Sequence, residues 1–217
     1  MSQQSPDPKE MARNLRKPEG DFGKKVGEFM NKGNANTYAK MKKHLALQKQ
    51  PVLLEIGFGN GVTSKEIMQQ SKYSGLDYSA DMVQQAEILC AEEIKNHGAK
   101  LFCGDIHQMP FEDHSFDVIF TINTIYFWDK PEVAISELRR VLKENGKLFI
   151  GMRTKEDMDA LSNITQNGFT IRPLAEVENL LRKGGFTNIQ YTVYADPVVQ
   201  RPDGKVIQLH SVIFEVG

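Results

Sequence analysis

The chain has 217 residues, of which 40% are apolar and 25% charged, and this composition predicts one globular domain with its own core. No apolar run approaches the roughly 18–20 residues of a membrane span, and the N-terminus lacks the apolar segment of a secretory signal. We therefore expect a cytoplasmic protein with no membrane span. Cys90 and Cys103 lack the spacing of metal ligands, so we expect two buried, reduced thiols and no metal site.

The net charge of −1 conceals a basic N-terminal segment. Residues 1–50 carry 11 lysines and arginines against 5 acidic residues. Such a segment can bind nucleic acid or an anionic substrate. The simpler interpretation, which we favour, is that Lys40, Lys42, Lys43 and Lys49 form the solvated face of a helix.

The first 48 residues are expected to form an N-terminal arm and a helical lid, separate from the main domain at 49–217. Three prolines in residues 1–20 predict an irregular arm. The glycines in 21–34 favour short helical pieces or an ordered loop. Apolar residues at near-helical spacing predict a helix over 35–48.

Strands and helices alternate from residue 52 onward. The apolar runs predict five strands, at 52–56, 73–76, 100–103, 116–122 and 147–152. Helices are expected at 62–71, from an N-cap at Ser79 to a C-terminal glycine at Gly98, and after a capping box formed by Asp129 and Glu132. A turn is expected over 144–147, before the fifth strand.

The pattern lapses after residue 153 and resumes with a helix that begins at Pro173 and ends at Gly184. Two β-rich runs, 187–194 and 205–216, close the chain and should pair antiparallel because a short polar loop joins them. Alternating strands and helices predict an α/β fold, with a mostly parallel sheet covered on both faces. Ligands of such sheets bind beyond the carboxyl ends of the strands.

Three glycines, Gly57, Gly59 and Gly61, follow the first strand directly and indicate a backbone that passes very close to a ligand. The spacing is not the G-x-G-x-x-G of nicotinamide sites, because Val62 stands at the third glycine position, and no Walker motif follows. Asp77, at the end of the second strand, can accept hydrogen bonds from two ribose hydroxyls. Asp105 can similarly accept a bond from an adenine amine. The alternatives are that Asp77 caps the next helix and that Asp105 is an ordinary loop residue.

In this order the motifs resemble those of class I S-adenosylmethionine-dependent methyltransferases. The resemblance covers 52–152 and is carried by the segments 54–61, 75–79, 104–106, 116–119 and 138–148. The last of these is similar to the R-V-L-K-P-G-G segment of the ubiquinone/menaquinone-biosynthesis type, with Glu144 and Asn145 in place of the Pro-Gly pair. The fold that the resemblance implies is a Rossmann-like three-layer sandwich whose seven-stranded sheet has its last strand antiparallel.

The resemblance also implies S-adenosylmethionine as the cofactor and a role for each matching residue. Glu55 and the three glycines would hold the methionine portion, and Asp77 the ribose. Tyr78 or Met82 would cover the adenine, which Asp105 and Ile106 recognise, and the backbone near Asn123 would contact the amino group. Tyr38 can reach the cofactor carboxylate, although a role as a core tyrosine is equally compatible with the sequence.

The aromatic segment 123–128 follows the fourth strand and favours a small, partly apolar or aromatic methyl acceptor, unless Phe127 and Trp128 simply pack under the next helix. His107 and Tyr126 are the candidate catalytic residues, and His114 and His210 are the other histidines that can approach the site. Asn123 and Tyr126 match only the ends of the N-P-P-Y pattern of amino-methyltransferases.

We expect segment 21–48, with Phe29, Met30, Asn31 and Asn34, to close over the cofactor, and 154–172 to cover the other side of the pocket. The expected function is methyl transfer to a small molecule. The alternatives are an RNA or protein methyltransferase that uses the basic arm and a non-catalytic S-adenosylmethionine-binding protein. Nucleic acid is not the expected partner, and both a monomer and a homodimer remain open.

Overall fold

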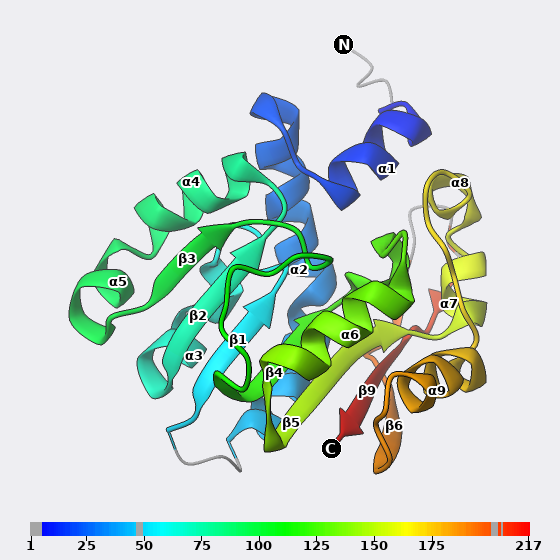
Figure 1. The fold of residues 1–217 in the computed structure, drawn as a ribbon. Helices are drawn as coiled ribbons and strands as arrows, with labels where there is room; N and C mark the ends of the chain where they lie inside the picture. Colours follow the sequence, from blue (N-terminus) through cyan, green and yellow to red (C-terminus); the bar gives the residue numbers. More distant parts are fainter. Residues whose placement is uncertain (1–5, 47–49, 201–203, 205) are drawn as a thin grey trace.

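A seven-stranded sheet with helices on both faces forms the centre of the computed structural model, which describes residues 6–46, 50–200, 204 and 206–217 (Figure 1). Its strands are β1 (Val52–Ile56), β2 (Lys72–Asp77), β3 (Lys100–Cys103), β4 (Phe116–Ile122), β5 (Leu142–Arg153), β6 (Ile189–Ala195) and β9 (His210–Val216). They lie in the order β3-β2-β1-β4-β5-β9-β6. Only β9 among them runs antiparallel to its neighbours, β5 and β6, so the predicted Rossmann-like sheet is confirmed.

Helices bury one core on each face of this sheet. The face that carries Leu53 and Phe120 is covered by α2 (Gly20–Leu45), α3 (Lys65–Gln70), α4 (Ala80–Leu89) and α5 (Ala91–His97). The face that carries Leu54 and Ile119 is covered by α6 (Pro131–Val141) and α9 (Leu174–Lys183). A small separate sheet pairs β7 (Val199–Gln200) with β8 (Val206–Ile207). No helix of the described residues is long and apolar enough to cross a membrane.

The N-terminal segment is more helical than the sequence indicated. The irregular arm predicted for residues 1–20 is wrong for the described residues 6–20, because α1 (Pro8–Arg16) starts at a proline in its first turn after the N-cap Asp7; residues 1–5 lie outside the described residues. The glycine-rich segment 21–34 is the first half of one 26-residue helix, α2. Two of its glycines allow close packing: a Cβ atom at Gly23 would lie 2.7 Å from the Pro18 carbonyl carbon, and one at Gly27 would lie 3.2 Å from the Met82 sulfur. Tertiary packing therefore outweighs the low helix propensity of glycine here.

Two local predictions around α6 are wrong for tertiary reasons. Asp129 does not cap this helix, whose N-cap is Lys130 without a side-chain hydrogen bond; the carboxylate of Asp129 instead pairs with Arg16. The turn expected over 144–147 is part of β5, where the register against β4 shifts between Phe116 and Val118. Extra residues in one strand produce such a shift without ending the strand.

Other local predictions gave mixed outcomes. Ser79 caps α4 as predicted, and Gly98 ends α5 with a positive φ of 68°, but the single helix expected between them is broken at Cys90. Pro173 is the N-cap of α9 rather than its first residue. Cys90 is buried as expected, whereas Cys103 is exposed.

The carboxyl ends of the parallel strands meet beneath a roof of N-terminal and late-chain segments. In Figure 1, α1 and the start of α2 lie above this edge, and α7 (Lys155–Asp159) and α8 (Ser162–Thr165) lie beside them. The contact between α1 and α8 joins segments about 150 positions apart in the chain. This roof encloses the space where ligands of parallel sheets bind.

Candidate active site

The glycine turn after β1 forms one wall of a cavity. Gly57, Gly59 and Gly61 all have positive φ, at 77°, 61° and 75°. A Cβ atom at Gly57 would lie 2.4 Å from the Cγ2 atom of Thr124, whereas one at Gly59 would meet no atom within 4 Å. Gly57 and Gly59 line the cavity and Gly61 lies behind them, against Cys90. Glycine is therefore required at this turn both for the backbone conformation and for the close approach.

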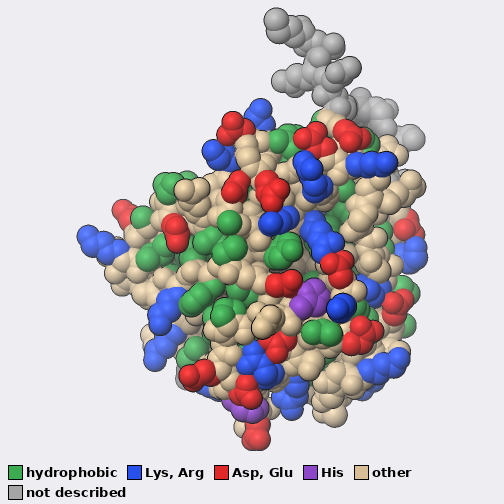
Figure 2. Space-filling view, turned by 45° about the horizontal axis from the view of Figure 1, so that its top comes forward, with side chains coloured by type: hydrophobic (Ala, Val, Ile, Leu, Met, Phe, Trp, Pro, Cys, Tyr) green, Lys and Arg blue, Asp and Glu red, His purple; other side chains and the backbone are tan. Residues whose placement is uncertain are grey.

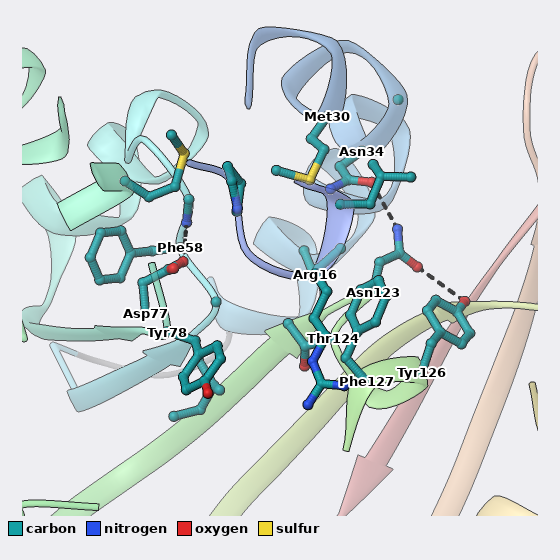
Figure 3. A pocket seen from close by; sticks show the side chains of 18 of the residues that line it. Arg16, Met30, Asn34, Phe58, Asp77, Tyr78, Asn123, Thr124, Tyr126 and Phe127 are labelled. Atoms are coloured by element: carbon teal, nitrogen blue, oxygen red, sulfur yellow. Dashed lines mark hydrogen bonds between the residues drawn. The ribbon is translucent and has the colours of Figure 1, made fainter. Parts of the chain in front are cut away.

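The cavity has a volume of about 410 Å³ and lies at the carboxyl ends of the strands. It falls in the size range of small-molecule sites, roughly 300–1,000 Å³. Figure 3 shows Asp77 and Tyr78 on one side of it and Asn123, Tyr126 and Phe127 on the other. The α2 residues predicted to close the site, Phe29, Met30, Asn31, Asn34 and Tyr38, all line the cavity. Residues of 154–172 line the opposite wall, as expected: Met158, Leu161, Ile164, Thr165 and Phe169.

Asp77 lies at the end of β2 and is buried. Its carboxylate accepts hydrogen bonds from the backbone nitrogens of Gly59, at 2.7 Å, and Ser79, at 2.9 Å. Burial nevertheless raises the pKa of Asp77 from 3.8 to about 6, since these bonds offset only part of the desolvation. A carboxylate accepts up to four hydrogen bonds, so Asp77 retains capacity for the hydroxyl groups of a ligand.

Tyr78 and Met82 flank Asp77 in different ways. Tyr78 is 46% exposed at the cavity mouth, with the Lys17 ammonium 5.1 Å from its ring centroid. Met82 is fully buried beneath α2, and both side chains line the cavity.

Asp105, Ile106 and His107 line the cavity beside β3. One carboxylate oxygen of Asp105 accepts from the His107 backbone nitrogen, at 2.9 Å, and lies 2.5 Å from the Nδ1 atom of its ring. The Nε2 atom of His107 accepts from the Lys130 backbone nitrogen, at 3.3 Å. Both ring nitrogens therefore have partners, and neither is free to take a proton from a ligand.

Glu55 lies behind the cavity wall rather than in it. It is 1% exposed, and its two oxygens accept hydrogen bonds from the phenols of Tyr38, at 2.5 Å, and Tyr73, at 2.6 Å. Burial raises the pKa of all three side chains, so the phenols remain proton donors. Tyr38 thus ties α2 to β1, and it contributes its ring to the cavity.

Asn123 joins three elements at the end of β4. It has a positive φ of 57°, an uncommon conformation for a residue other than glycine. Its Nδ2 atom donates to Asn34 of α2, at 2.8 Å, and its Oδ1 atom accepts from the Tyr126 hydroxyl, at 3.2 Å (Figure 3). The same hydroxyl accepts from the backbone nitrogen of Arg153, at 2.6 Å. Burial raises the pKa of Tyr126 well above its ordinary value, so this phenol stays neutral.

Aromatic side chains gather on the far side from Asp77. The rings of Phe127 and Phe169 have centroids 4.6 Å apart, and Tyr126 lies 6.0 Å from Phe169. Trp128 is buried at 3% exposure and packs in the core beneath α6, yet it also lines the cavity. The aromatic segment 123–128 therefore both lines the cavity and packs in the core, as the two interpretations of the sequence proposed separately.

Two charged cavity residues were not predicted from the sequence, Arg16 and Arg153. Arg153 ends β5, so the rule that places ligands at the carboxyl ends of strands could have found it. Arg16 comes from a segment with no periodic pattern. His114 and His210, in contrast, do not line the cavity: His114 lies beside the Leu142 carbonyl oxygen, and the ring of His210 lies against Asp157.

Comparison with known proteins identifies the kind of domain that contains the cavity. Residues 54–150 match the model of a methyltransferase domain. The putative methyltransferase YrhH of Bacillus subtilis is 28% identical over 109 residues, which is 50% of this chain and 61% of that protein. Residues 54–150 form a class I S-adenosylmethionine-dependent methyltransferase domain. The chain spans between about a third and three fifths of the length of the first curated relatives that it matches.

Two solved structures share the fold of this methyltransferase domain. One, from Thermotoga maritima, is described as an S-adenosylmethionine-dependent methyltransferase and possible histamine N-methyltransferase; it has a TM-score of 0.67 and 21% identity and covers 94% of this chain and 98% of its own. The other is phosphoethanolamine N-methyltransferase 2 of Haemonchus contortus, with S-adenosylhomocysteine bound; its TM-score is 0.63, with 18% identity, and it covers 83% of this chain and 52% of its own.

S-adenosylmethionine is the cofactor of this domain, and the residues present fit it. The glycine turn leaves space at Gly59 for a ligand chain, and Asp77 retains acceptor capacity for two ribose hydroxyls. Ile106 is a buried apolar side chain beside Asp105, suited to pack on a base.

Proposed function

We propose that the protein transfers a methyl group from S-adenosylmethionine to a small, partly apolar or aromatic molecule. Bound S-adenosylmethionine supplies a methyl group already activated by the sulfonium, which the acceptor attacks in line with the carbon–sulfur bond. The protein therefore contributes mainly alignment, which can be worth roughly 7–11 kcal/mol, and exclusion of water.

The observation that carries this proposal is the continuity of the cavity. One cavity joins the glycine turn and Asp77 to the aromatic cluster of Tyr126, Phe127 and Phe169. A ligand held at the first part thus presents its reacting end to the second. The resemblance of 138–148 to methyltransferases of ubiquinone and menaquinone biosynthesis agrees with an apolar or aromatic acceptor.

We assign roles within the cavity as follows. Gly57 and Gly59 pass close to the methionine portion, and Asp77 accepts from the ribose. Asp105 and Ile106 recognise the adenine, with Tyr78 and Met82 on its other face. Asn123 stands between this half and the acceptor half. Glu55 acts indirectly, since its two phenolic partners fix Tyr38 and hold α2 over the site.

The charge distribution favours a small acceptor over RNA or protein. Four lysines of the basic segment are paired with acids: Lys17 with Glu19, Lys24 with Asp21, Lys40 with Asp196 and Lys42 with Glu66. Lys49 lies outside the described residues. On the face above the cavity, basic and acidic side chains alternate rather than forming one basic stripe (Figure 2). A nucleic-acid site would instead present clustered cations.

A methyl-transfer assay tests the proposal. Protein is incubated with methyl-labelled S-adenosylmethionine and panels of small phenols, quinones, amines, thiols and carboxylates, of total RNA and of mixed peptides, and S-adenosylhomocysteine release is measured. The expected result is turnover in the small-molecule panel that is lost in Gly57→Ala and retained in Gly168→Ala, a glycine with positive φ and open space around it. Turnover confined to RNA or peptides would contradict the proposal, and cofactor binding without any turnover would favour a non-catalytic protein.

A further inference from the structure

The charged side chains that line the cavity are divided between its two halves. The carboxylates of Asp77 and Asp105 lie at the ends of β2 and β3, in the half assigned to adenosine. Arg153, at the end of β5, lines the half assigned to the acceptor, and Arg16 of α1 lies between Tyr78 and Phe127 (Figure 3). In the described part of the chain, no carboxylate side chain lines the acceptor half.

Arg153 is a buried cation that is only partly neutralised. Its Nη1 atom donates to Asp196, at 3.1 Å, and its Nη2 atom to the Gly33 carbonyl oxygen, at 3.0 Å. The same Asp196 carboxylate pairs with Lys40, so one acid serves two cations. Burial raises the pKa of Asp196, but hydrogen bonds from Lys40, Ser211 and Arg153 outweigh this and hold it below its ordinary value. The group of Lys40, Arg153 and Asp196 therefore has a surplus positive charge beside the cavity.

One further acid and one histidine lie near this group. Asp157 does not line the cavity; its carboxylate accepts from the His210 backbone nitrogen, at 2.5 Å, and lies 3.2 Å from the Nδ1 atom of that ring. Arg16 is more exposed than Arg153 and pairs with Asp129, outside the cavity lining. Arg153 is accordingly the cation best placed to meet a buried ligand.

No group in the acceptor half is free to remove a proton. Besides the two arginines, the titratable side chains lining the cavity among the described residues are Tyr38, Asp77, Tyr78, Asp105, His107 and Tyr126. Of these, Tyr38 and Tyr126 are neutral phenols held in hydrogen bonds, and both nitrogens of His107 have partners. Asp77, Tyr78 and Asp105 belong to the adenosine half. An acceptor that must lose its proton during transfer would find no base here.

We propose that the acceptor enters with its nucleophile already ionised, as a carboxylate or thiolate on a small apolar or aromatic body, and that Arg153 receives this anion. The inference rests on the proposed methyl transfer. A lone pair of the anion forms the new bond to the methyl carbon, while the electron pair of the carbon–sulfur bond passes to sulfur. The products are a methyl ester or thioether and S-adenosylhomocysteine, and no proton is released.

The apolar side chains that line the cavity favour methyl transfer to an anionic acceptor over transfer to a neutral one. An anion and a sulfonium cation neutralise each other as they approach the transition state, so a medium of low dielectric constant speeds the reaction relative to water. An anion in an apolar cavity needs a charged partner to offset its desolvation. Arg153 supplies that partner without supplying or taking a proton, since its guanidinium does not deprotonate.

A pair of ligands that differ only in charge tests the inference. Phenylacetate and phenylacetamide are titrated calorimetrically into the protein, with S-adenosylhomocysteine titrated first in the same cell. The expected result is that phenylacetate binds about tenfold more tightly or better, as is typical of charge-assisted hydrogen bonds. Equal affinities, tighter binding of the amide, or no binding of phenylacetate would overturn the inference. Normal binding of S-adenosylhomocysteine in such a case would leave the proposed function intact.

Substitutions test whether Arg153 causes the preference for phenylacetate over phenylacetamide. Arg153→Gln should abolish it, and Arg153→Lys should retain part of it. Asp196→Asn removes the shared counter-charge and should strengthen phenylacetate binding while leaving phenylacetamide unchanged. Arg139→Gln, a control whose guanidinium lies over the ring of Phe186, should behave as the original protein. Thermal melts check folding; if Arg153→Gln fails to fold, the opposite shift in Asp196→Asn decides the question, and its absence refutes the role of Arg153.

Discussion

Lowering the pH from about 7 to about 5 should weaken cofactor binding through Asp77. Burial raises the pKa of this carboxyl from 3.8 to about 6, which corresponds to about 3 kcal/mol at 1.36 kcal/mol for each pH unit. The folded-state pKa is raised, so the contribution of this group to stability is complete below 3.8 and is lost as the pH rises through about 6. At neutral pH the free protein therefore holds an ionised, incompletely solvated carboxylate.

Ribose hydroxyls that donate to this carboxylate would favour its ionised form and lower its pKa in the complex. With a pKa of about 6 in the free protein, about one molecule in ten is ionised at pH 5, so the dissociation constant of S-adenosylhomocysteine should be about tenfold higher at pH 5 than at pH 7. Titration calorimetry at constant ionic strength measures it. Asp77→Asn should bind weakly with no such dependence, and Asp105→Asn should retain the dependence. A constant affinity between pH 5 and pH 7, or a dependence that survives in Asp77→Asn, would refute this reasoning.

Three further variants test other parts of the site. Gly57→Ala and Gly59→Ala should both weaken cofactor binding by calorimetry, but they should differ in stability. The Cβ added at Gly57 would lie 2.4 Å from a Thr124 methyl carbon, whereas the one at Gly59 meets open space and costs only the roughly 1 kcal/mol of positive φ. An equal loss of unfolding free energy in the two variants would contradict the packing argument. Tyr73→Phe removes a donor to buried Glu55 and should lower the free energy of unfolding by roughly 1–3 kcal/mol in urea titrations, so an unchanged midpoint would argue against that bond. Phe169→Ala should raise the KM of the acceptor while leaving the dissociation constant of S-adenosylhomocysteine unchanged. If only the dissociation constant changed, the assignment of Phe169 to the acceptor half would be contradicted.

The sheet and its ligand-binding edge could be predicted because local pattern and tertiary structure agree there. Strands β3 and β4 begin and end at the predicted residues, since each is a short apolar run bounded by polar residues or glycine. Asp77, Asp105 and Asn123 meet at one edge because the strands that precede them are parallel. The number of strands came from the family resemblance, and their order, which depends on pairing between distant segments, is known only from the structure.

The N-terminal region could not be predicted in the same way, because its conformation depends on distant contacts. The glycines of α2 argue against a long helix locally, but Gly27 is needed for the approach of Met82. Asp129 is a good capping residue by sequence, yet its carboxylate pairs with Arg16, which lies 113 positions earlier. His107 is a candidate base by sequence, yet its Nε2 atom accepts a hydrogen bond from the backbone nitrogen of Lys130, 23 positions later. In each case the partner is invisible in a local pattern.

The measurement that tests the central claim most directly is a calorimetric titration of the protein with S-adenosylhomocysteine and, separately, with S-adenosylmethionine. The account predicts saturable binding of both at one site per chain, weakened by Gly57→Ala and by Asp77→Asn. Absence of binding by the folded protein, or binding that both substitutions leave unchanged, would contradict the assignment of this cavity to the cofactor.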